Sequence, residues 1–274
     1  MSLRILLLIA LAMLAFAGNS LLCRLALKET AMDAASFTTV RLFSGTLMLW
    51  LLQRCRRGHL AGDWCSALAL FAYAACFSFA YLELSAATGA LLLFGAVQLT
   101  MMGAGLWRGE RLHRGQQVGA ALALLGLVWL LLPGLAAPPL ASGLLMLAAG
   151  LAWGLYSLWG RGQREPLAAT AGNFARALLP ALGLSLLLFP SARWEPVGLA
   201  YAVASGALAS GLGYALWYAA LPALRATSAA TVQLSVPVLA AFGGVLLLAE
   251  PLGWRLLLSS LVVLGGVALV IRGR

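Results

Sequence analysis

Long apolar stretches separated by short polar connectors run through the whole chain. Each stretch has about 20 residues, the length that an α-helix needs to cross a bilayer, and is bounded by charged residues, proline or glycine. The expected helices cover residues 4–23, 35–53, 64–82, 85–106, 116–133, 140–159, 168–189, 197–219, 226–248 and 254–271. The pattern therefore predicts an all-α protein with ten transmembrane helices.

The composition excludes an ordinary water-soluble domain. The chain has 274 residues, of which 63% are hydrophobic and 9% are charged, and its mean hydropathy is +0.97. Soluble domains carry about 25% charged residues, and a soluble fold of this length could not hide so much apolar surface. The sequence therefore predicts an integral membrane protein whose exterior contacts the lipid bilayer.

The basic charge indicates membrane orientation and not nucleic-acid binding. The net charge is +10, but the 18 Lys and Arg residues are spread between the apolar stretches and form no patch interleaved with aromatic residues. Counted over the predicted connectors, 12 of them fall on one side of the membrane, 4 on the other side and two inside helices. By the positive-inside rule this bias places both termini in the cytoplasm.

The cysteine and histidine pattern predicts neither a metal site nor a disulfide framework. Cys23, Cys55, Cys65 and Cys76 form no CxxC pair, and the two histidines stand alone in connectors. No cofactor is expected.

The two halves of the sequence, residues 1–137 and 138–274, resemble each other. At an offset of 140 residues Glu110 aligns with Glu250, and a glycine in the last helix of each half aligns as well. Each half holds five predicted helices, and because five is odd the second half must enter the membrane from the opposite face. Such inverted repeats surround a central cavity in many transporters, which open it first to one side and then to the other.

Several short motifs carry a family resemblance. They are Trp-Tyr-Ala-Ala-Leu at 217–221, Thr-Ser-Ala-Ala at 227–230, Pro-Val at 237–238, Ala-Glu-Pro-Leu at 249–252 and Gly-Glu-Arg-Leu at 109–112. Together they resemble the drug/metabolite transporter (DMT) superfamily, EamA type. The resemblance spans nearly the whole chain. It implies a ten-helix fold around a central cavity, in a bacterial inner membrane, that moves small metabolites, often outward.

Two arginines lie inside predicted helices. Arg41 and Arg176 align between the halves near an offset of 135 residues. A charge at the bilayer centre costs about 2.5–3.5 kcal/mol on insertion scales, so such residues usually face the protein interior. Two interpretations stay open: the arginines bind a carboxylate or phosphate of the solute, or they extend to the lipid headgroups.

Amide and aromatic side chains are the remaining candidates for a substrate site. Asn19, Gln98 and Gln233 lie in apolar helices, where an amide needs either a hydrogen-bond partner on another helix or a wet cavity. The aromatic candidates for lining the cavity are Trp153, Tyr156 and Tyr214. The aromatic residues expected in the belts at the membrane interfaces are Tyr81, Trp217 and Tyr218.

Acidic residues are scarce, and none lies in the middle of a predicted helix. Glu110 and Glu250 stand at predicted helix starts, where a carboxylate offsets the helix macrodipole and caps free N–H groups. Glu83, between the third and fourth helices, is the candidate for coupling transport to a proton. Facilitated exchange is the alternative to such coupling.

Membrane transport is the function that these features favour. A membrane enzyme would need clustered acids, a histidine or a nucleophile, and the chain has no DxxD, HExxH or GxSxG motif. A scaffolding subunit would not need polar groups inside both repeats. We therefore predict a non-enzymatic transporter that exports small metabolites such as amino acids by alternating access. We expect it to be a monomer or a homodimer. Multidrug efflux is the alternative, although cationic drugs favour buried carboxylates, which are scarce in this chain.

Overall fold

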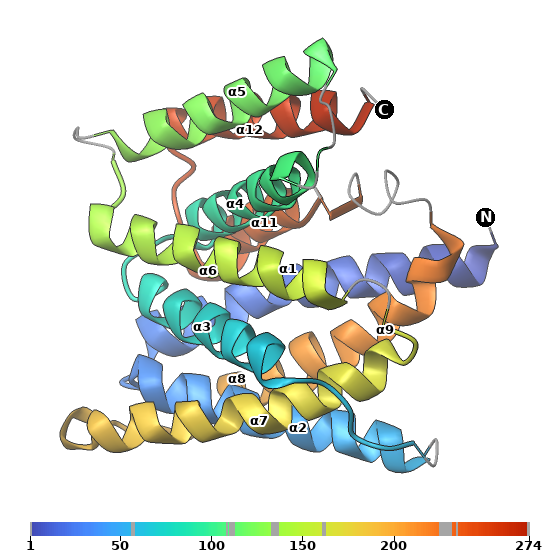
Figure 1. Ribbon diagram of the computed structural model, residues 1–274. Coiled ribbons are helices and arrows are strands. Elements are labelled where there is room, and N and C mark those ends of the chain that lie inside the picture. The colour runs from blue at the N-terminus through green and yellow to red at the C-terminus, as the bar shows by residue number, and fades with distance from the viewer. Residues whose placement is uncertain are drawn as a thin grey trace.

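The computed structural model describes residues 2–55, 58–107, 109, 113–132, 137–160, 163–224, 232–233 and 235–272, and the regular structure of these residues is entirely helical (Figure 1). The helices of the first half are α1 (Leu3–Glu29), α2 (Ala34–Cys55), α3 (Trp64–Ala80), α4 (Ala86–Trp107) and α5 (Arg114–Leu131). Those of the second half are α6 (Leu140–Gly160), α7 (Pro166–Leu187), η1 (Phe189–Ser191), α8 (Pro196–Ala204), η2 (Ser205–Leu212), α9 (Gly213–Ala220), η3 (Leu221–Ala223), α11 (Ser235–Leu248) and α12 (Trp254–Arg272).

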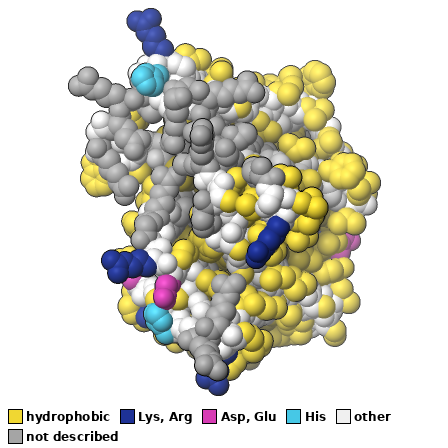
Figure 2. All heavy atoms as spheres, turned by 90° about the vertical axis from the view of Figure 1, so that its right-hand side faces the viewer, with side chains coloured by type: hydrophobic (Ala, Val, Ile, Leu, Met, Phe, Trp, Pro, Cys, Tyr) yellow, Lys and Arg dark blue, Asp and Glu magenta, His cyan; other side chains and the backbone are white. Residues whose placement is uncertain are grey.

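The described helices have the length and the exterior of membrane-spanning segments. Six are long and apolar enough to cross a bilayer, among them the continuous segment Pro196–Ala220 formed by α8, η2 and α9. Large apolar side chains point outward, with Trp107 94% and Leu187 81% exposed, and hydrophobic atoms cover the flank of the molecule in Figure 2. Lipid solvates such an exterior and water does not, so the chain is a multi-pass membrane protein.

Two aspartates cap helices outside the apolar segments. The carboxylate of Asp33 accepts hydrogen bonds from the N–H groups of Ser36 at the start of α2 (2.9 Å) and of Arg193 (2.9 Å). Asp63 caps α3 by accepting a hydrogen bond from the N–H group of Ser66 (2.8 Å). Partial burial acts to raise the pKa of Asp33, but its hydrogen bonds outweigh burial and lower that pKa. The hydrogen bond from Ser66 lowers the pKa of Asp63.

Helices α5 and α12 pack backbone to backbone at one edge of the bundle (Figure 1). The contact depends on glycine, because a Cβ atom on Gly119 would collide with the carbonyl oxygen of Gly266. Arg255, near the start of α12, donates hydrogen bonds to the carbonyl oxygens of Trp129 and Leu132 at the end of α5. The pair therefore forms a tight unit beside the helices that surround the centre.

The middle of the bundle is enclosed by α1, α3, α4, α6 and the α8–η2–α9 segment, while α2 and α7 pack side by side against one face of this group (Figure 1). Figure 1 also places both ends of the chain at the same end of the bundle. The central helices are therefore the elements that can position a site.

The structure differs from the predicted helices in one boundary and in one helix type. Helix α1 continues to Glu29 and not to about residue 23, so Arg24 lies inside a helix and is buried at 9% exposure. The helix expected at 197–219 contains the π-helical segment η2. Apolar residues mark the part of a helix that lies in lipid. The helix itself can continue beyond that part, to the point where its backbone hydrogen bonds end.

Candidate functional site

A cavity of about 460 Å³ lies in the middle of the bundle. Its walls come from α1, α3 and α4 of the first half and from α6, η2 and α9 of the second half, together with Gln233 just before α11. Among the described residues its lining reaches the surface at Gln163, which is exposed, and at Leu221 and Leu224, which are partly exposed; we call this end the mouth. The volume falls within the range of about 300–1,000 Å³ that is typical of small-molecule sites.

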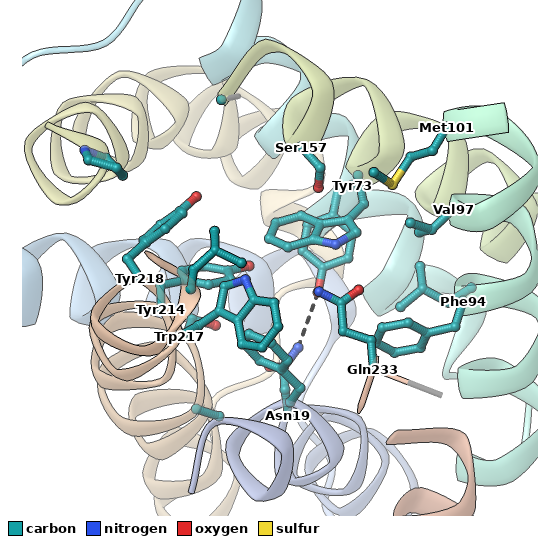
Figure 3. A pocket seen from close by; sticks show the side chains of 18 of the residues that line it. Asn19, Tyr73, Phe94, Val97, Met101, Ser157, Tyr214, Trp217, Tyr218 and Gln233 are labelled. Atoms are coloured by element: carbon teal, nitrogen blue, oxygen red, sulfur yellow. Dashed lines mark hydrogen bonds between the residues drawn. The ribbon is translucent and has the colours of Figure 1, made fainter. Parts of the chain in front are cut away.

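Aromatic rings form one wall of this cavity, and Figure 3 shows Tyr73, Tyr214, Trp217 and Tyr218 among them. The indole of Trp153 on α6 stacks on the ring of Tyr214 on α9, with centroids 5.2 Å apart and an interplanar angle of 18°. The ring of Tyr73 on α3 tilts against the same indole at 4.9 Å. Rings held in this way give a rigid surface on which the apolar part of a solute can pack.

Amide side chains from both halves line the cavity. They belong to Asn19 on α1, Gln98 on α4 and Gln233, and Figure 3 shows Asn19 and Gln233 reaching into the same space. The Asn19 amide is held in place, because its Nδ2 donates to the Tyr73 hydroxyl (3.2 Å) and its Oδ1 accepts from the Ser205 hydroxyl (2.6 Å). The cavity therefore combines apolar rings with a few oriented polar groups.

Arg41 lies directly behind the cavity wall, with 1% of its surface exposed. Its Nη2 donates to the Tyr73 hydroxyl (3.0 Å), and its Nε donates a longer hydrogen bond to the Ser210 hydroxyl (3.4 Å). The guanidinium carbon also lies 4.9 Å from the centroid of the Phe77 ring. Tyr73, Phe77 and Ser210 all line the cavity, so a cation stands behind three lining residues.

The π-helical segment η2 brings two serines to this polar group. Ser205 donates to Asn19, and Ser210 accepts from Arg41. The close approach of η2 to α2 requires a glycine, because a Cβ atom on Gly206 would collide with the Ser44 hydroxyl and with the carbonyl oxygen of Arg41. Such π segments are frequent at functional sites, where they re-aim side chains within a helix.

The end of the bundle opposite the mouth is closed by a buried ion pair. Arg24 on α1 donates from Nε to Glu250 between α11 and α12 (3.0 Å), and their side chains are 11% and 7% exposed. The other Glu250 oxygen accepts from the N–H group of Ala86 (2.8 Å) at the start of α4. Arg24 Nη1 also donates to the carbonyl oxygens of Tyr81 (2.8 Å) and Leu82 (2.9 Å). We call these five residues the closing cluster.

The predicted capping role of Glu250 is wrong in its target. Glu250 caps α4 from a distant part of the chain and pairs with Arg24, whereas α12 begins at Trp254. The preceding residue, Ala249, has a left-handed backbone (φ 48°) that turns the chain and directs Glu250 into the bundle. Glu110, the equivalent residue of the first half, lies outside the described residues.

Arg176 and Tyr156 do not line the cavity. Arg176 donates to the carbonyl oxygens of Ala61 (2.7 Å) and Gly172 (3.0 Å) and so ties α7 to the connector before α3. Tyr156 lines a much smaller neighbouring cavity, where its hydroxyl contacts that of Thr170 (3.5 Å). The two arginines that align between the halves therefore have different surroundings.

Glu83 is exposed and accepts a hydrogen bond from Ser142. This bond joins the α3–α4 connector to α6.

Three aromatic residues that were expected in the belts at the membrane interfaces face the protein interior instead. Tyr81 is fully buried in the closing cluster, and Trp217 and Tyr218 line the cavity. A residue close to a helix end in the sequence can thus face the protein interior and not the membrane interface.

Five of the side chains predicted to bind the solute line the cavity: Asn19, Gln98, Trp153, Tyr214 and Gln233. Residues that the sequence analysis missed are Ser205 and Ser210. Serine is common in apolar helices, and the sequence gives no sign that the helical period widens at η2.

An apolar, multi-pass helical bundle with a central cavity that is lined by aromatic and amide groups is an architecture that membrane transporters use. The sequence profile of the EamA-like transporter family matches residues 3–132 and again residues 141–272. The chain therefore belongs to the EamA-like transporter family, whose members are transporters and not enzymes, and it carries a solute across a membrane.

Several proteins resemble the chain over nearly its whole length. An uncharacterized protein of Pseudomonas aeruginosa is 62% identical over 274 residues, covering 99% of this chain and 96% of that protein. An uncharacterized transporter of Archaeoglobus fulgidus is 26% identical over 277 residues, covering 96% of each chain. A solved crystal structure with 20% identity shares the fold, with a TM-score of 0.67 over 98% of each chain.

Proposed function

We propose that this chain exports small metabolites by alternating access to the central cavity, and that amino acids are the first candidate solutes. One observation carries the proposal: amide and aromatic groups from both halves meet in a cavity that is open at one end and closed at the other by a buried ion pair. A solute bound there would reach the opposite side of the membrane only when the closing cluster separates.

We infer that residues 1–137 and 138–274 are inverted repeats with ten crossing helices in total. If α1 to α5 correspond to α6, α7, α8–α9, α11 and α12, the helix contacts are symmetric. The contacts α2–α7, α4–α11 and α5–α12 map onto themselves when the halves are exchanged, and α3–α6 maps onto α1–α9. This symmetry supports two counter-oriented units that can rock against each other.

The distribution of charge around the cavity favours metabolites over cationic drugs. Stacked rings would also suit flat drugs, which is the observation in favour of multidrug efflux. However, no carboxylate lines the cavity in the described part of the chain, whereas Arg41 stands behind its wall. A cation would therefore enter a site without a counter-charge.

We further propose that the protein lies in the bacterial inner membrane with both termini in the cytoplasm, as a monomer or homodimer. Figure 2 looks onto the end that carries the termini, where Lys, Arg and His side chains stand out from the surface. The positive-inside rule turns this end toward the cytoplasm. The cavity mouth then faces the cytoplasm, where an exporter loads its solute.

Export by exchange, without proton coupling, fits the positions of the acidic residues. Glu83 bonds to Ser142 at the surface, and Glu250 is neutralised by Arg24 in the closing cluster. Neither carboxylate lines the cavity. Proton flux recorded in proteoliposomes during solute movement would contradict exchange and would favour proton coupling through Glu83.

The proposed function can be tested with proteoliposomes loaded with labelled amino acids. Efflux is expected from wild-type vesicles and is expected to fall in Gln233→Ala and Trp153→Leu variants, because both side chains line the cavity. Trp159→Leu is the matched control, since Trp159 lies on the same helix but is 43% exposed on the outer surface. Absence of efflux of every amino acid from wild-type vesicles would refute the proposal.

A further inference from the structure

The guanidinium of Arg41 is a buried charge whose hydrogen-bonding capacity is not filled. Its Nη1 has no hydrogen-bond partner among the described residues, and none of the ion pairs found there involves Arg41. Contacts with the rings of Tyr73 (5.1 Å) and Phe77 (4.9 Å) offset part of the desolvation. A buried charge is normally paired, so this arrangement needs a partner beyond those found in the described part of the chain.

The two hydroxyls that Arg41 contacts each have a proton free to donate. The Tyr73 oxygen accepts from Arg41 Nη2 (3.0 Å) and from Asn19 Nδ2 (3.2 Å), which fills its two acceptor positions. The Ser210 oxygen accepts from Arg41 Nε (3.4 Å). No hydrogen bond in which either hydroxyl donates is found within the described ranges, and both residues line the cavity.

We propose that the Tyr73 and Ser210 hydroxyls form a subsite for a carboxylate of the transported solute, with Arg41 behind them as its counter-charge. The proposal rests on the proposed function and names the chemical class of solute. A hydroxyl that accepts from a cation becomes a stronger donor, and hydrogen bonds to an ionised group are about twice as strong as neutral ones. A carboxylate, which only accepts, fits two such donors.

The surroundings of this subsite fit the rest of an amino acid or an aromatic acid. The Tyr73 ring touches the Trp153 indole, which stacks on Tyr214, so the donors adjoin the aromatic wall. A solute whose carboxylate lies at Tyr73 and Ser210 would place its apolar body on these rings. The charge of Arg41 disfavours a cation close to the two donors, so the ammonium group of an amino acid would lie away from them, over the faces of the aromatic rings.

A structural role for Arg41 is the competing explanation, because its contacts join α2 to α3 and to η2. Such a role predicts that substitutions change stability or total activity. It does not predict a change in the preference between an acid and its uncharged analogue. The test therefore measures that preference.

The transport experiment uses the labelled amino acid that wild-type proteoliposomes move fastest, with unlabelled competitors. The competitors are the same amino acid and its carboxamide, in which an uncharged amide replaces the carboxylate. For the wild type we expect inhibition by the acid at a concentration about tenfold lower than by the carboxamide. Tyr73→Phe and Ser210→Ala should each lower this ratio, and Arg41→Gln should bring it close to one. Arg41→Lys should keep part of it.

Tyr201→Phe is the matched control, because Tyr201 is partly buried on α8 and does not line the cavity. It should show the wild-type ratio. A wild-type ratio near one, or an undiminished ratio in Arg41→Gln and in both hydroxyl variants, would overturn the subsite and leave transport itself intact. Tyr73→Phe and Ser210→Ala keep the side-chain shape nearly unchanged, so they decide the question if Arg41→Gln does not fold.

A second measurement separates the subsite from the proposed function. Purified protein is heated with 3-phenylpropionate or with 3-phenylpropanamide, which share an aromatic body. We expect a higher unfolding temperature with the acid than with the amide, and loss of this difference in Tyr73→Phe. Equal shifts with both probes would contradict the subsite, whether or not any amino acid is transported.

Discussion

Glu250→Gln is expected to weaken the closed end of the cavity while leaving its shape in place. Glutamine keeps the volume of glutamate and can still accept the hydrogen bond from the Ala86 N–H group. It removes the charge that compensates Arg24, whose partner distance is 3.0 Å and whose side chain is 11% exposed. Breaking one side of a buried ion pair costs about 3–5 kcal/mol. If about 3 kcal/mol of this falls on the closed state, the ratio of closed to open molecules drops about hundredfold.

Cys23 is a built-in reporter for this opening. Its side chain is fully buried on α1, next to Arg24. In a chain with Cys55, Cys65 and Cys76 replaced by serine, a membrane-impermeant thiol reagent should label Cys23 at least about tenfold faster in Glu250→Gln than in the parent.

The combined variant Arg24→Gln with Glu250→Gln is the control, because it removes both charges. Its labelling rate should lie below that of Glu250→Gln alone, since no uncompensated charge remains. Labelling of Glu250→Gln at the parental rate, in protein that is still folded, would refute the view that the ion pair holds this end shut.

Three further changes test the local structure by thermal unfolding of the purified protein. Ala249→Gly should raise the free energy of unfolding by about 0.5–1 kcal/mol. The left-handed backbone costs alanine about 1–2 kcal/mol, and the greater flexibility of glycine in the unfolded chain offsets part of the relief. An unchanged free energy of unfolding would contradict backbone strain at Ala249. Asp63→Ala should lose about 1 kcal/mol as α3 loses its cap. Because the pKa of Asp63 is lower in the folded state, its contribution is complete above the unfolded pKa and is lost as the pH falls through the folded pKa. Asp63→Asn should keep most of the stability and lose this pH dependence; an unchanged acid profile would count against the cap. Gly206→Ala should destabilise by about 1–3 kcal/mol through collision with the Arg41 carbonyl, whereas Gly183→Ala, with open space around it, should not.

Much of the fold could be predicted from apolar length alone. A segment that crosses lipid must satisfy its own backbone hydrogen bonds, which a stretch of about 20 apolar residues does as a helix, so such stretches locate the elements. The extension of α1 past Arg24 could not be predicted in this way. It depends on Glu250, which lies 226 positions away in sequence and becomes a neighbour only in the folded bundle.

Part of the candidate site could be predicted from the sequence for a similar reason. Amides such as Asn19, Gln98 and Gln233 stand out against an apolar background, and all three line the cavity. Arg41 and Arg176 look equivalent in the sequence, yet one is buried behind the cavity and the other ties down a connector. Their difference arises from helix packing, which composition does not encode.

Two-sided access to one cavity residue tests the central claim most directly. Ser157 on α6 lines the cavity and is partly exposed, so Ser157→Cys in a background without other cysteines reports on the cavity itself. Alternating access predicts that an impermeant thiol reagent labels this cysteine from either side of the membrane and that the transported solute slows both reactions. Labelling from one side alone, unaffected by solute, would contradict a cavity that opens in turn to each side.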